Sequence, residues 1–82
     1  MSTLRYWAAA RAAAGTASDE VDADTLRDAL EQVVVRRGGR LREVLAVCSY
    51  VVDGDPVGAR PHDAVRLRPD GLVDVLPPFA GG

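Results

Sequence analysis

The sequence has few of the residues that build most catalytic and metal-binding sites. Its 82 residues include one cysteine, Cys48, and one histidine, His62, so a cluster of cysteine and histidine ligands cannot form. A lone cysteine also excludes an internal disulfide bond, and its apolar neighbours favour a small buried side chain over a reactive thiol. We expect His62 to lie in a solvated loop. All ten basic residues are arginine, so no lysine side chain is available for modification.

The charges and the hydrophobic runs exclude two further classes of protein. The net charge is −2 and the basic residues are scattered, whereas a nucleic-acid-binding domain carries a concentrated basic face. The apolar runs are too short to span a bilayer, and no secretory signal is visible, so we expect a cytoplasmic protein. The densest arginine cluster surrounds a predicted helix end, where it complements the helix dipole or, alternatively, binds a phosphate or a partner: Arg36, Arg37, Arg40 and Arg42.

Hydrophobic periodicity predicts one main helix and about five strands. Apolar residues recur at helical spacing over residues 26–34, after an N-cap at Asp24 or Thr25 and before a stop at Gly38-Gly39. The alanine-rich residues 8–14 are predicted to form a short helical turn or a loop packed on the body, and residues 41–45 a short helical turn. Alternating or β-branched segments predict strands at residues 3–7, 17–21, 47–52, 55–57 and 72–76.

The order of these elements predicts the fold class. Asp53-Gly54 is typical of a hairpin turn, and Pro56 places the following short strand at a sheet edge. A chain of this length forms one domain with one small core. We therefore expect residues 1–82 to form a single α+β domain, with a mixed sheet of about five strands packed on one main helix.

The predicted body of the domain offers no enzyme chemistry. Ser49 lies inside a strand and lacks the G-x-S-x-G turn of a nucleophilic serine. The acidic residues are spread singly, and Gly38-Gly39 follows a helix, whereas a phosphate-binding loop precedes one. Any chemistry is therefore expected outside the folded body.

The strongest functional signal is the segment Leu76-Pro77-Pro78-Phe79-Ala80-Gly81-Gly82. The prolines stiffen this segment, and the glycines could pass through a channel too narrow for side chains. Residues 77–82 would reach roughly 20 Å if extended. We interpret residues 77–82 as a flexible tail that places the carboxylate of Gly82 in another protein's active site. A frayed glycine-rich end is the alternative.

This segment resembles the end of the small subunit of molybdopterin synthase, the MoaD branch of the MoaD/ThiS ubiquitin-like sulfur carriers. The resemblance runs over the whole chain and implies a β-grasp (ubiquitin-like) fold, which matches the predicted order of elements. Its weaker motifs are Tyr6-Trp7, Arg11 before Gly15, Thr25-Leu26-Arg27-Asp28, Val52-Asp53-Gly54 and Asp70-Gly71.

The resemblance implies that this chain carries sulfur and binds no cofactor or metal itself. An E1-like adenylyltransferase would activate Gly82, at the end of the Gly81-Gly82 tail, with Mg-ATP. A persulfide-dependent sulfurtransferase would then convert Gly82 to a thiocarboxylate. The large subunit of molybdopterin synthase would use that sulfur in molybdenum cofactor biosynthesis. The chain would be the non-catalytic small subunit, because the active-site residues would lie on the large subunit.

The resemblance also implies a partner interface. Strand alternation places Trp7 on the sheet face opposite Tyr6, so we expect it to be exposed; packing beneath the alanine-rich segment is the alternative. An exposed tryptophan is typical of interface centres. The residues expected to contact the large subunit are Trp7, Pro56, Leu76 and Phe79.

Other functions fit the same ending. The chain could carry sulfur for thiamin thiazole or cysteine biosynthesis, modify proteins by joining their lysines through Gly82, or be a plain binding module. Pro77-Pro78 favours the molybdopterin branch. Deleting Gly81 and Gly82 would abolish sulfur transfer or conjugation and would leave a binding module unaffected.

Overall fold

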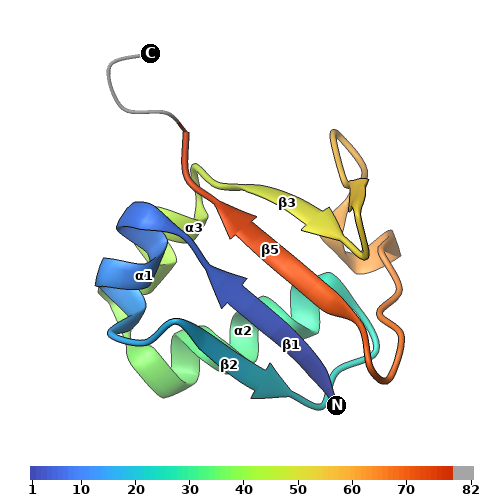
Figure 1. Ribbon diagram of the computed structural model, residues 1–82, viewed down its shortest axis with the longest axis horizontal. Coiled ribbons are helices and arrows are strands. Elements are labelled where there is room, and N and C mark those ends of the chain that lie inside the picture. Colours follow the sequence, from blue (N-terminus) through green and yellow to red (C-terminus); the bar gives the residue numbers. More distant parts are fainter. Residues whose placement is uncertain (79–82) are drawn as a thin grey trace.

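The computed structural model describes residues 1–78, and its helices cover one face of a five-stranded sheet (Figure 1). The strand order is β2-β1-β5-β3-β4, and β1 is parallel to β5 while the other pairs are antiparallel. The strands are β1 (Ser2–Tyr6), β2 (Ser18–Val21), β3 (Ser49–Val52), β4 (Asp55–Pro56) and β5 (Leu72–Leu76). The helices are α1 (Ala8–Ala14), α2 (Leu26–Arg37), α3 (Gly39–Leu45) and a short 3-10 turn, η1 (His62–Ala64).

The first strand alternates between the two faces, as its sequence predicts. Leu4 and Tyr6 are buried against the helices, whereas Arg5 and Trp7 are exposed. The strand ends at Tyr6, one residue earlier than predicted, because the carbonyl of Trp7 accepts hydrogen bonds from the N–H groups of the first turn of α1. Trp7 is thus the N-cap residue of this helix.

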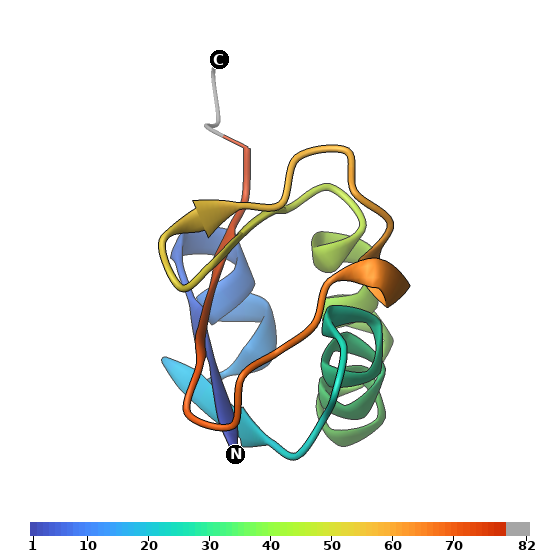
Figure 2. The same ribbon diagram turned by 90° about the vertical axis from the view of Figure 1, so that its right-hand side faces the viewer.

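The main helix, α2, begins and ends where its sequence predicts. The hydroxyl of Thr25 accepts a hydrogen bond from the Asp28 N–H at 3.2 Å, and Gly38 ends the helix with a φ of 102°. Gly39, predicted as part of the stop, already begins α3. Figure 2 shows α2 packed on one side of the sheet. The whole predicted apolar stripe of this helix is buried: Leu26, Ala29, Leu30, Val33 and Val34.

The second half of the chain departs from prediction around Val47 and His62, and its edge strand β4 also ends at Pro56, one residue earlier than predicted. The strand predicted from residue 47 begins at Ser49, because the N–H groups of Val47 and Cys48 bond to carbonyls at the end of α3. Val47 is therefore exposed and Cys48 is half-buried. His62 is also half-buried; its ring packs edge-on against Tyr50, with centroids 5.1 Å apart, and is not free in a loop.

A buried carboxylate ties α2 to the sheet. Asp19 of β2 accepts hydrogen bonds from the Tyr6 hydroxyl at 2.8 Å, from Arg36 at 3.1 Å and from Arg37 at 3.1 Å. Burial alone would raise the pKa of Asp19, but the hydrogen bonds from Arg37, Tyr6 and Arg36 lower it. Two arginines in the last turn of α2 therefore have a second structural role besides complementing the helix dipole. Arg42 pairs with Glu31 at 3.4 Å.

Candidate functional site

Side chains from four strands form one row on the face of the sheet that the helices leave uncovered. Paired residues of neighbouring strands share a face of a sheet. Asp74 of β5 is paired with Arg5 of β1 on one side and with Val51 of β3 on the other. Val51 is paired in turn with Pro56 of the edge strand β4. The predicted contact residue Pro56 is therefore exposed on the same face as Arg5.

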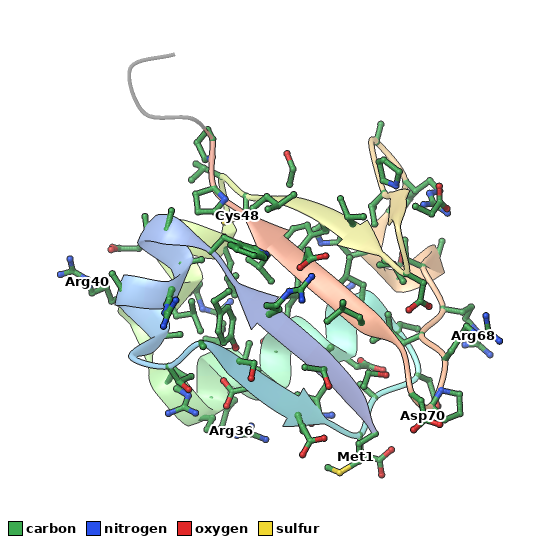
Figure 3. The ribbon with its side chains drawn as sticks, viewed as in Figure 1. Met1, Arg36, Arg40, Cys48, Arg68 and Asp70 are labelled. Atoms are coloured by element: carbon green, nitrogen blue, oxygen red, sulfur yellow. The ribbon has the colours of Figure 1, made fainter. Side chains whose placement is uncertain are left out.

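An apolar groove lies at the end of this face where β1 and β5 finish. Ser49 and Leu76 are paired there, and the chain leaves the sheet through Pro77 and Pro78. Figure 3 shows Cys48 near this end of the sheet, whereas Arg68 and Asp70 lie at the opposite end. The groove is lined by Trp7, Ala8, Ala9, Ser49, Leu76, Pro77 and Pro78.

The groove brings two of the predicted contact residues together. Trp7 is 45% exposed, which rules out the alternative that it belongs to the core. Leu76 is half-buried beside it. The remaining predicted site residues, Phe79, Gly81 and Gly82, lie outside the described residues. They follow Pro78 in the sequence, and Pro78 lines the groove.

The indole of Trp7 is held in place by two charged neighbours. One carboxylate oxygen of Asp74, Oδ1, accepts hydrogen bonds from Trp7 Nε1 at 2.9 Å and from Arg5 Nε at 2.7 Å. The guanidinium carbon of Arg5 lies 5.1 Å from the centre of the indole ring, a cation–π distance. The bond from Arg5, and secondarily the bond from Trp7, hold the pKa of Asp74 below its usual value despite partial burial.

Arg5 and Asp74 were not among the site residues predicted from the sequence. Each was recognisable as an outward-facing residue of a strand, since the alternation on both strands is clear. Their proximity depends on the parallel pairing of β1 with β5, which no local pattern reveals. An ion pair between the first and last strands becomes visible only in the folded sheet.

The rest of the described chain offers no competing chemical site. Burial raises the pKa of the Cys48 thiol to about 11, and its sulfur lies 3.2 Å from the carbonyl oxygen of Val44, so the thiol stays protonated at neutral pH. Within residues 1–78 no group of three or more histidine, cysteine or acidic side chains could hold a metal ion. Each helix in that range is too short or too polar to cross a membrane.

Comparison with known proteins shows similarity at the level of structure. No family model matches the chain, and no curated protein matches its sequence. The small archaeal modifier protein 1 of Methanosarcina acetivorans superposes with a TM-score of 0.84 at 18% identity, over 99% of this chain and 95% of that one. A chain of the BexX/CysO complex of Amycolatopsis orientalis gives 0.83 at 18% identity, over 100% of both chains.

A third solved structure is the complex of subunits 1 and 2 of the molybdopterin-converting factor of Helicobacter pylori. It gives a TM-score of 0.68 at 17% identity, over 99% of this chain and 97% of the matched chain. At these identities the likeness establishes the fold. The protein therefore has the β-grasp fold that the sequence resemblance implied, and these solved structures share it.

Proposed function

We propose that this protein is a sulfur carrier in which Gly82 becomes a thiocarboxylate. The observation that supports the proposal is the Pro77-Pro78-Phe79-Ala80-Gly81-Gly82 sequence following the last strand of a β-grasp body. This segment starts at the rim of an apolar groove. The described body offers no alternative reacting group, because Cys48 is protonated and His62 packs against Tyr50.

The chemistry requires a free carboxyl group on Gly82 and takes place in a partner's active site. A carboxylate is a poor electrophile, so an E1-like enzyme first joins it to AMP from Mg-ATP and releases pyrophosphate. The outer sulfur of a persulfide on a sulfurtransferase then displaces AMP and forms an acyl disulfide. A thiol cleaves that disulfide, which releases the thiocarboxylate and leaves a new disulfide on the sulfurtransferase. The two glycines suit this step because they have no side chains to obstruct a narrow channel.

The acceptor we propose is the large subunit of molybdopterin synthase. Pro77-Pro78 favours this acceptor, as does the likeness to a molybdopterin-converting factor subunit that was solved in a two-subunit complex. The likeness to a small archaeal modifier protein keeps protein modification as a competing function. Sulfur transfer for cysteine or thiamin thiazole biosynthesis is the other competing function. Sulfur loading and the choice of acceptor must therefore be tested in two separate steps.

Intact-mass analysis tests the loading step. The full chain is incubated with an E1-like activating enzyme, Mg-ATP, a persulfide sulfur source and a thiol reductant, and the expected product has one oxygen exchanged for sulfur on Gly82. The unreacted chain's mass also establishes whether Gly82 is its last residue. A variant lacking Gly81 and Gly82 is the control and should remain unmodified. An unchanged mass with several cognate activating enzymes would refute the proposal.

The loaded protein is then offered each acceptor in turn. Sulfur appearing in molybdopterin, in the presence of the large subunit and the cyclic pyranopterin precursor, supports the proposed pathway. Sulfur appearing in cysteine or in the thiamin thiazole would assign the carrier to the competing pathway. Formation of adducts with lysines of other proteins would identify a modifier.

A further inference from the structure

Arg5 is bound to Asp74 through one nitrogen only. Its Nε donates to Asp74 Oδ1, and its two terminal nitrogens, Nη1 and Nη2, have no hydrogen-bond partner within residues 1–78. The Arg5 side chain is 47% exposed, and it lies beside the exposed indole of Trp7. Arginine's terminal nitrogens form a planar fork that fits a carboxylate with two parallel hydrogen bonds. This face therefore offers the terminal nitrogens of Arg5 as hydrogen-bond donors next to the apolar indole of Trp7.

We propose that Arg5 and Asp74 are positioning residues that hold Trp7 rigid for docking, and that Arg5 also binds a carboxylate of the acceptor enzyme. The inference rests on the proposed function, because it names that acceptor, the large subunit of molybdopterin synthase, as the occupant of this face. The partner surface is an apolar pocket for the indole with an aspartate or glutamate at its rim. Of the Arg5 nitrogens, only Nε donates a hydrogen bond to Asp74, so the two terminal nitrogens of Arg5 can bind the partner.

The physical advantage of this arrangement is a pre-organised anchor. A tryptophan that must be immobilised on binding loses rotamer freedom, whereas an indole already fixed by a hydrogen bond and a stacked cation has less to lose. Trp7 has both contacts, and its backbone N–H is fixed as well, by a bond to the Val75 carbonyl at 3.2 Å. Tryptophan and arginine are also the residues most enriched among those that dominate binding energy.

Substitutions at Asp74 test the positioning role. Trp7 is the only tryptophan, so its fluorescence anisotropy in the free protein reports the motion of the anchor. Asp74→Leu removes the acceptor and should lower the anisotropy and weaken binding to the large subunit by about tenfold. Asp74→Asn keeps an oxygen that can accept a hydrogen bond from the indole N–H. It should therefore retain the wild-type anisotropy and bind the large subunit more tightly than Asp74→Leu does. Unchanged affinity in Asp74→Leu would overturn the positioning role.

A cross-linking experiment tests the proposed carboxylate. Because the chain contains no lysine, Arg5→Lys introduces its only side-chain amine. Asp74→Asn is combined with it, and with its control, so that no carboxylate of the same chain lies beside the new amine. Carbodiimide coupling, which joins an amine to a carboxylate in direct contact, should link this amine to an aspartate or glutamate of the large subunit. Arg27→Lys places the same amine on the exposed side of α2, in the layer behind the sheet, and should give no such link. If the two variants couple to the large subunit equally, or if neither couples, Arg5 does not contact a carboxylate of that subunit.

Failure of this inference is distinguishable from failure of the proposed function. Sulfur loading of Gly82 is measured separately, by intact mass, and needs only the activating enzyme. A wild-type protein that loads sulfur but does not bind the large subunit would overturn the choice of occupant and leave the carrier role standing. Sedimentation that reveals a dimer dissociated by Trp7→Ala would assign the face to a second copy and would also overturn the proposal.

Discussion

Replacing Trp7 by alanine is expected to weaken acceptor binding with little effect on folding, whereas replacing its neighbour Tyr6 by alanine is expected to destabilise the fold. The two aromatic residues are adjacent in the sequence, at the end of β1 and at the N-cap of α1, and their side chains lie on opposite sides of the sheet. Tyr6 is 2% exposed and donates a buried hydrogen bond to Asp19, while Trp7 is 45% exposed and bonds to Asp74 at the surface. The pair is therefore a matched test of the two faces.

The structure sets the expected magnitudes. Tyr6→Ala leaves a large cavity in the core, a change that costs about 3–5 kcal/mol. A domain of 82 residues has a free energy of unfolding of about 4–12 kcal/mol, so this variant loses a large part of its stability. Trp7→Ala removes one surface hydrogen bond and should lower the free energy of unfolding by about 1 kcal/mol. If Trp7 is a binding anchor, the dissociation constant should rise at least about 30-fold.

Two measurements check these values. Urea unfolding followed by circular dichroism gives the free energy of unfolding without relying on tryptophan fluorescence, which the Trp7→Ala variant lacks. Calorimetric titration with the large subunit gives the dissociation constant. Tyr6→Phe is the control, because it retains the ring and removes only the hydroxyl bonded to the Asp19 carboxylate, at a cost of about 2 kcal/mol.

Two results would refute the reasoning. If Trp7→Ala and Tyr6→Ala lose similar amounts of unfolding free energy, Trp7 contributes to the core despite its exposure. If Trp7→Ala folds normally and binds the large subunit as tightly as the wild-type protein, the groove beside Leu76 is not the docking surface.

Two further predictions concern titratable groups. The pKa of Asp19 lies below its usual 3.8, so its stabilising contribution is present above about pH 4 and is lost as the pH falls through the folded-state pKa. Asp19→Asn should therefore lower the free energy of unfolding by about 3 kcal/mol at pH 7, and by progressively less below pH 4; a constant difference from pH 7 to pH 2 would contradict this. Burial raises the pKa of Cys48 from 9.0 to about 11, so at pH 8 its alkylation by iodoacetamide should be about 100-fold slower in the folded than in the urea-unfolded protein; equal rates would show that the thiol is not protected.

Much of the fold was predictable because its signals are local. The apolar stripe of α2 and the Thr25 cap depend on residues within a few positions of one another, and both appear in the structure as predicted. The Asp53-Gly54 hairpin is equally local, and both residues have the positive φ values that such a turn requires, 50° and 82°. The strand boundaries differ from prediction by one or two residues where hydrogen bonds at a helix end compete with strand pairing. The strand predicted from Val47 starts late because the end of α3 uses the N–H groups of Val47 and Cys48.

By itself, the sequence determined which face each strand residue takes, where the main helix lies, and that Gly82 is the group expected to react. Only the tertiary structure decided which strands are neighbours. The parallel pairing of β1 with β5 joins Arg5 to Asp74 across 69 positions of the chain and fixes Trp7 at the groove. Periodicity encodes the side of a strand that faces the core and contains no information about lateral order. That order emerges when the inward faces of β1, β2, β3 and β5 are buried together against the helices, with β4 added at the edge.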